Sequence, residues 1–90
     1  MTIYEELRKR GYSSKMAGTW HLIEAVQMSR QTGRLMYTTK ELYPALAKAA
    51  GTNPAVIERR IRYSIGQAEP GRTNTEVIRE LAYGGLDYED

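Results

Sequence analysis

The chain of 90 residues contains no cysteine, which excludes disulfide bonds and thiolate metal sites. Its single histidine, His21, cannot build a zinc site alone. No apolar run reaches the roughly eighteen residues of a transmembrane helix, and the N-terminal segment is too acidic for a signal peptide. The sequence suggests neither a nucleophile–base pair nor a P-loop. We therefore expect a soluble, cytoplasmic protein that is not an enzyme, with no cofactor, no metal and no membrane partner.

Charge is unevenly distributed along the chain, although the formal net charge is only +2. Residues 1–68 contain eleven lysines and arginines against five acidic residues, a net charge of +6. Residues 69–90 contain two against six, a net charge of −4. A basic body with an acidic end favours a polyanionic partner. Random scatter of charge in a small protein is the alternative interpretation.

Capping motifs and glycines at the expected ends of helices predict an all-α domain. Thr-x-x-Glu sequences begin at Thr2, Thr38 and Thr73, and each is typical of a capping box. Helical spacing and following glycines predict five helices, over residues 3–10, 14–31, 44–50, 54–67 and 74–83. Because Pro44 conflicts with a helix that starts near Thr38, we expect an irregular turn at residues 40–43. The predicted architecture is a compact helical domain over residues 1–85 with a flexible acidic tail at 86–90.

The second predicted helix has an apolar stripe that we assign to the core. Met16, Trp20 and Ile23 recur at helical spacing, and a ligand pocket lined by them is the less favoured interpretation. His21 is expected on the surface of the same helix.

Residues 43–65 have the features of a helix-turn-helix. Ala47 supplies the small residue that such a motif needs where its two helices cross, and Gly51, four residues later, suits a turn with positive φ. Asn53 is disfavoured in the α region by Pro54 and can cap the second helix, while Pro54 fits its first position. Hairpins of amphipathic helices that bind no DNA also show this spacing.

The second helix of the motif is divided between an apolar and a cationic side. Its apolar ridge consists of Ile57, Ile61 and Ile65. The opposite side carries Val56, Arg59 and Tyr63, flanked by Ala55, Arg60 and Arg62. Because arginine makes bidentate contacts to guanine and also clamps phosphates, this side favours DNA contact. The alternative is a solvated face on which Glu58 pairs with Arg62 at i+4.

Three sequence blocks carry a family resemblance. Gly18 with residues 22–28 is similar to G-x-x-x-L-x-E-A-I-x-M, residues 39–48 to T-K-x-L-Y-P-x-I-A-K, and residues 56–65 to R-V-E-R-A-I-R-H-A-I. A weaker block at residues 73–78 is similar to P-T-N-S-E-F-I. Together they resemble the C-terminal effector domain of the sporulation-initiation response regulator of endospore-forming Firmicutes.

The resemblance implies an all-helical domain that binds a short DNA box through the E-R-x-I-R helix. By position, Glu58 and Arg59 would face the bases, and Arg62 and Tyr63 would follow the DNA backbone. The chain departs from the pattern at Val56, where the family has arginine, and at Tyr63, where it has histidine. The segment between residues 67 and 73 is shorter than the family's, which holds another helix. Only ten residues precede Gly11, so we expect a stand-alone effector domain without a phosphoacceptor receiver domain.

The sequence therefore predicts a sequence-specific DNA-binding transcriptional regulator whose recognition helix, about 54–67, enters the major groove of double-stranded DNA. The predicted DNA-binding residues are Thr39, Lys40, Asn53, Val56, Glu58, Arg59, Arg60, Arg62 and Tyr63. A homodimer on tandem sites and a protein partner remain open. The alternative function is that of a small interaction or inhibitor protein, of phage or mobile-element type, on a helix-turn-helix-like scaffold. The lack of an aromatic stacking platform argues against RNA binding.

Overall fold

The computed structural model describes residues 2–33 and 36–84, and all regular elements within them are helices, which confirms the predicted all-α class. In chain order the elements are α1 (Ile3–Lys9), α2 (Ala17–Thr32), the π-helix η1 (Thr38–Leu42), α3 (Tyr43–Ala50), α4 (Pro54–Ala68) and α5 (Asn74–Tyr83). The expected tail at 86–90 lies outside the described residues. None of the described helices is long and apolar enough to cross a membrane.

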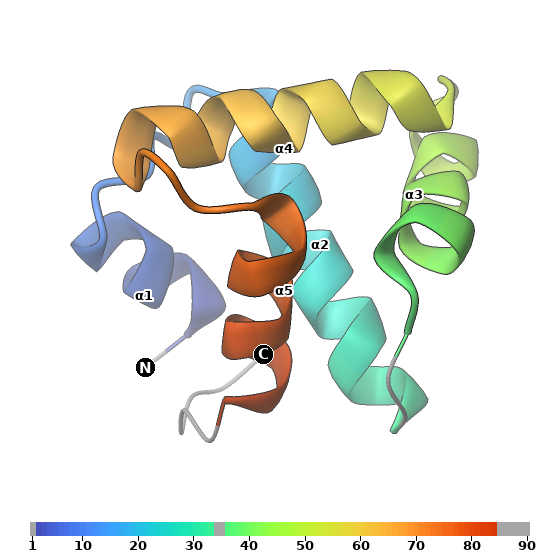
Figure 1. Ribbon diagram of the computed structural model, residues 1–90, viewed down its shortest axis with the longest axis horizontal. Coiled ribbons are helices and arrows are strands. Elements are labelled where there is room, and N and C mark those ends of the chain that lie inside the picture. The colour runs from blue at the N-terminus through green and yellow to red at the C-terminus, as the bar shows by residue number, and fades with distance from the viewer. Residues whose placement is uncertain (1, 34–35, 85–90) are drawn as a thin grey trace.

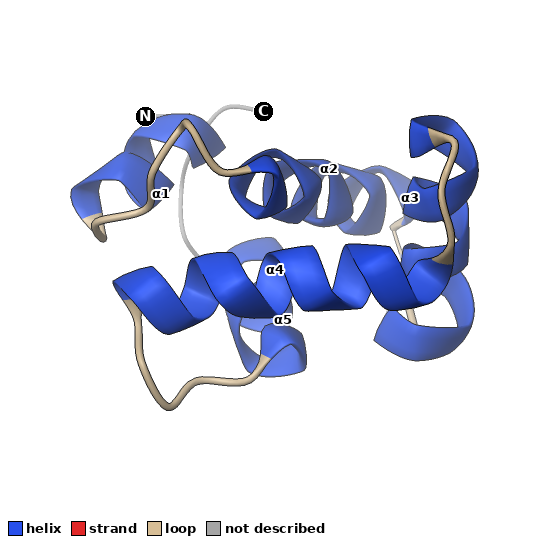
Figure 2. Ribbon diagram, turned by 90° about the horizontal axis from the view of Figure 1, so that it is seen from above, coloured by secondary structure: helices blue, strands red, loops and turns tan. Residues whose placement is uncertain are grey.

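Helix α4 lies across one end of the molecule, and the other helices are arranged beneath it (Figure 1). Helix α2 packs most extensively on α4 and next on α5, so it forms the centre of the fold. Helices α1 and α3 lie at opposite sides, which is also visible from above (Figure 2). The core is one cluster of buried side chains drawn from every element: Ile3, Leu7, Tyr12, Leu22, Ile23, Ala25, Val26, Leu42, Tyr43, Leu46, Ala47, Ile57, Ile61, Ile65, Val77, Ile78 and Leu81.

Two of the three predicted capping boxes are confirmed. The Thr2 hydroxyl accepts from the Glu5 backbone N–H at 3.1 Å, and the Glu5 carboxylate accepts from the Thr2 N–H at 3.2 Å. Thr73 and Glu76 form the same pair of bonds at 3.2 and 3.1 Å. These bonds satisfy amide groups that have no partner within the first helical turn.

The box predicted at Thr38 and Glu41 is wrong. Thr38 lies inside the π-helix η1, so the N-cap position passes to Tyr37. The Glu41 carboxylate accepts from the Tyr37 N–H at 3.0 Å instead. The irregular turn that Pro44 predicted is therefore a π-helical turn, and regular helix begins at Tyr43, one residue earlier than expected.

The start of the second helix also differs from its prediction. Helix α2 begins at Ala17, and the residues before it form turns instead of the helix expected from residue 14. Trp20 is not a core residue. Its side chain remains 46% exposed, its indole N–H donates to the Ser14 carbonyl at 2.8 Å, and its ring stacks on Tyr4 with centroids 5.5 Å apart. His21, expected on the surface, is buried with 8% exposure because it faces α4.

A polar network joins α1 to the C-terminal part of the fold. The Arg10 guanidinium donates to Glu6 at 2.7 Å and to Glu80 of α5 at 2.6 Å. Arg72 donates to the second oxygen of Glu80 at 3.0 Å and to Glu69 at 3.4 Å. Hydrogen bonds from Arg72 and then from Arg10 lower the pKa of Glu80 below its usual value.

Tyr12 extends this network into the core. Its hydroxyl donates to the Glu69 carboxylate at 2.6 Å. Burial, followed by this hydrogen bond and the nearby negative charge, raises the pKa of Tyr12. Helix α1 is thus held by ionic and hydrogen-bonded contacts as well as by its buried leucine and isoleucine.

Candidate nucleic-acid interface

The turn between α3 and α4 has the geometry that its sequence predicts. Gly51 adopts the left-handed conformation with φ 70° and ends α3. The Thr52 N–H donates back to the Ala47 carbonyl at 2.9 Å, which satisfies one of the last carbonyls of the helix. Asn53 is extended, and its side-chain oxygen accepts from the Val56 N–H at 3.1 Å. Pro54 then occupies the first position of α4, so the direction of this helix is fixed at its start.

The inner side of α4 is fully buried, as the isoleucine ridge predicts. Ile57, Ile61 and Ile65 have at most 1% exposure, and Ala47 of α3, which packs on α4, is also buried. Asn74, at the first position of α5, donates from one side-chain nitrogen to the Tyr43 hydroxyl at 2.9 Å and to the Glu58 carbonyl at 3.1 Å. This bridge ties α5 to both α3 and α4, and no local pattern predicts it because Asn74 is distant along the chain from Tyr43 and Glu58.

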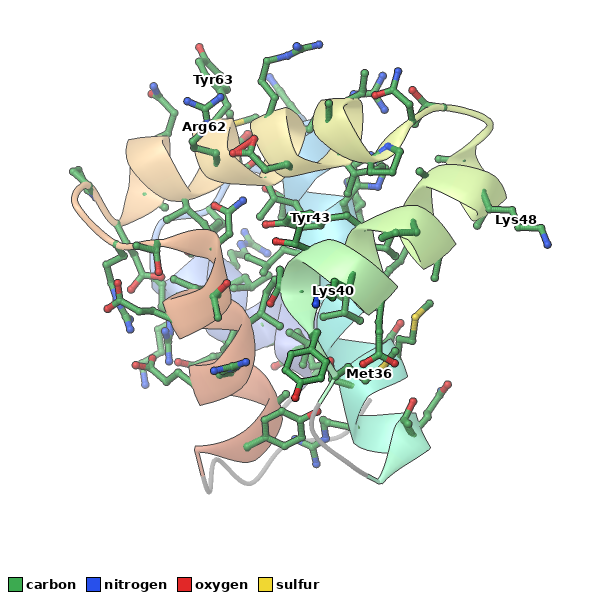
Figure 3. The ribbon with its side chains drawn as sticks, turned by 45° about the vertical axis from the view of Figure 1, so that its right-hand side comes forward. Met36, Lys40, Tyr43, Lys48, Arg62 and Tyr63 are labelled. Carbon is green, nitrogen blue, oxygen red and sulfur yellow. The ribbon has the colours of Figure 1, made fainter. Side chains whose placement is uncertain are left out.

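The outer side of α4 carries the cationic and aromatic residues. Arg59, Arg60, Arg62 and Tyr63 are exposed, Tyr63 by 64%, and Figure 3 shows Arg62 and Tyr63 projecting from the outer side of the helix. Arg62 and Glu58 form an ion pair at 3.0 Å, which the alternative interpretation of a solvated face also predicts. Such an exposed pair contributes only about 0–1 kcal/mol, so Arg62 remains available to a stronger anion.

A shallow groove lies between this side of α4 and a residue of η1. Its volume is about 390 Å³, and it is lined by Thr39, Tyr43, Pro54, Ala55, Glu58, Arg59 and Arg62. Of the predicted residues outside α4, Thr39 thus lies beside Glu58, Arg59 and Arg62 in one groove. Lys40 is exposed on η1 and lies beside Thr39, whereas the Asn53 side chain is engaged in capping. Val56 is half-buried near the start of α4.

A second hollow lies on the other flank of α4, against the start of α2. It is lined by Met16, Ala17, Gly18, Arg59, Arg60, Tyr63 and Ser64. The Arg60 guanidinium lies here 3.3 Å from the ring nitrogen Nε2 of His21. Sequence reasoning missed His21, Met16 and Ala17 as neighbours of the interface, since only Gly18 appeared in a family block. No group of three or more potential metal ligands occurs in the described part of the chain.

One family model matches residues 3–89, and its description is Sporulation initiation factor Spo0A C terminal. This family is the DNA-binding domain of a sporulation regulator, a regulatory and not a catalytic domain. The match extends from the first residue of α1 beyond the end of α5, so it includes the α3–α4 unit and every residue of the predicted interface. The chain therefore belongs to the family of Spo0A C-terminal domains, and the resemblance seen in its sequence is confirmed.

Proposed function

We propose that this chain is a sequence-specific transcriptional regulator that inserts α4 into the major groove of double-stranded DNA. One observation carries the proposal: the isoleucine side of α4 is fully buried, while three arginines and Tyr63 are exposed on its outer surface. The major groove of B-DNA is about 12 Å wide and admits a single α-helix. The arginines then lie where base edges and phosphates are found.

The first turns of α4 are assigned to base contacts. Arg59 has the donor geometry for the two acceptors of guanine, and the Glu58 carboxylate can accept from the cytosine amino group. Val56 has no hydrogen-bonding group in its side chain, but its methyl groups can contact the methyl group of thymine. These three residues carry the proposed sequence preference.

The remaining predicted residues are assigned to the DNA backbone. Arg60, Arg62 and Tyr63 flank the proposed base-facing residues. Thr39 of η1 lines the groove beside α4, and Lys40 is its exposed neighbour. Contacts of this kind fix the register and orientation of a protein on the duplex without reading its sequence. Asn53 acts indirectly, because its cap holds the start of α4.

The test is a titration of labelled duplexes, both random and selected for binding, between about 50 and 200 mM salt. Binding should weaken steeply as salt rises, since phosphate contacts release counterions. Arg59→Ala should weaken binding to the best selected sequence by about 1–3 kcal/mol. Lys48→Ala is the matched control, because Lys48 projects from α3 away from the groove (Figure 3).

Two results separate the proposal from its alternative. Equal affinity of wild type and Arg59→Ala for the selected sequence would remove Arg59 from the interface. Absence of any salt-dependent binding to duplex DNA would favour an interaction or inhibitor protein instead.

A further inference from the structure

We propose that a hollow between η1 and α5, which we call the η1–α5 hollow, binds a phosphate group. Its volume is about 230 Å³, and it is lined by Tyr37, Thr38, Thr39, Lys40, Thr75 and Arg79. Four of these residues are outside the predicted DNA-binding set, so the site extends beyond the interface described above. Every lining side chain can donate a hydrogen bond and none is a carboxylate, which suits an anion with several acceptor oxygens.

Two residues that line the hollow each have a buried donor without a partner in the part of the chain that the structure describes. Thr38 is only 5% exposed, and its hydroxyl forms no hydrogen bond within the described part of the chain. The Nε–H of Arg79 is likewise buried and unpaired among the described residues. Unpaired buried polar groups are uncommon in folded proteins because they lose water without gaining a new bond. A phosphate oxygen would supply the acceptor that both groups lack.

The cations at the hollow form no ion pair, within the described ranges of the chain, with the acidic side chains around them. Glu41 of η1 accepts from the Tyr37 N–H, Glu76 accepts from the Thr73 N–H, and Glu80 accepts from Arg10 and Arg72. Neither Lys40 nor Arg79 forms an ion pair within the described residues. Two cations from different elements therefore line one hollow without an ion pair to either of them from the described part of the chain, and a phosphate dianion would neutralise both charges while a diester would neutralise one.

The position of the hollow allows two sources for the phosphate group. Sites for drug-sized ligands have volumes of roughly 300–1,000 Å³, so this smaller hollow suits a single phosphate group. Thr39 lines both the η1–α5 hollow and the groove beside α4. A backbone phosphate of DNA bound at α4 is one source of the group, and this source rests on the proposed function. A small phosphate compound in solution is the other.

The first arm of the test measures affinity for the best selected duplex at several salt concentrations. Thr38→Val preserves the shape of a buried side chain and removes only the unpaired hydroxyl. If the phosphate belongs to DNA, Thr38→Val should weaken binding about tenfold with an unchanged salt slope, since no charge is lost. Arg79→Gln should weaken binding and also reduce the salt slope by about one. Lys48→Gln, which removes a distant charge, should change neither quantity.

The second arm uses inorganic phosphate alone, at constant ionic strength, with amide chemical shifts as the readout. A phosphate site is established if phosphate causes saturable shifts at residues 37–40 and 75–79 of the wild type and causes none in Arg79→Gln. If the variants also leave the duplex affinity unchanged, the source of the phosphate is a soluble compound. This arm requires no DNA binding, so it decides the inference even if the proposed function fails. The inference is overturned if Thr38→Val and Arg79→Gln bind DNA as the wild type does and phosphate causes no saturable shifts.

Discussion

The backbone of Gly18 in α2 lies directly against the main-chain carbonyl of Arg60 in α4. A methyl group added to Gly18 would overlap that carbonyl, and it would also crowd the Ser64 hydroxyl. The absence of a side chain at Gly18 therefore lets the central helix approach α4 along its backbone. Because α4 carries the proposed interface, this contact fixes how closely the helix of the proposed interface packs on α2.

Gly18→Ala should destabilise the domain by about 1–3 kcal/mol, since the two helix backbones must separate to admit the methyl group. Gly66→Ala is the matched control. Gly66 is also helical, but nothing lies within 4 Å of the added carbon. Alanine should therefore stabilise α4 there by about 0.5–1 kcal/mol. Urea unfolding of both variants checks the prediction, and a change of the same sign in both would contradict it.

Gly51→Val should destabilise the fold by about 1 kcal/mol or more, because Gly51 has φ 70° and a β-branched residue is disfavoured there. Gly51→Asn should cost less, since asparagine tolerates the left-handed region. Melting temperatures of the two variants and the wild type provide the comparison. A valine variant that melts with the wild type would show that the turn does not require glycine.

Val56→Arg should shift the preferred DNA sequence toward guanine at one position, because arginine pairs with both acceptors of guanine and valine with neither. The measurement is selection from randomised duplexes with the variant and the wild type in parallel. Lys48→Arg serves as a control for added arginine on a surface away from the groove. Identical selected sequences for Val56→Arg and the wild type would mean that residue 56 does not face the bases.

The free energy of unfolding should fall at acidic pH as the Glu80 carboxylate becomes protonated. Hydrogen bonds from Arg72 and Arg10 lower the pKa of Glu80 in the folded state, so the folded protein binds fewer protons than the unfolded chain. The stabilisation is complete above the unfolded pKa of about 4.3 and is lost as pH falls through the lower folded pKa. The free energy of unfolding of Glu80→Gln should lie below that of the wild type at pH 6, and the two should converge at low pH. A difference that is independent of pH would exclude this ionic contribution.

The features that the sequence predicted well are those encoded by neighbouring residues. Thr2, Asn53 and Thr73 cap their helices through contacts three residues away, so they can be recognised without knowledge of the fold. The isoleucine ridge and the exposed arginines of α4 likewise follow from helical periodicity within one segment. For the same reason the predicted bounds of α5 agree with the structure.

Most of the errors arise where a distant segment determines the environment of a residue. His21 is buried because α4 passes over it, and Trp20 lies at the surface, where it stacks on Tyr4 of a different helix. Thr38 matched the capping pattern but lies within a π-helical turn that precedes Pro44. The η1–α5 hollow was not predicted either, since Arg79 and Thr38 come together only when α5 packs near η1.

The bond between Arg10 and Glu80 joins residues that are 70 positions apart. Closing so long a segment of chain has a large entropic cost, so contacts of this kind tend to form after local helices have assembled. Interactions that are missing from the folding transition state act mainly on the rate of unfolding. We therefore expect the network around Arg10 to form late in folding and to act mainly on the rate of unfolding, and we expect the local helices to act mainly on the rate of folding.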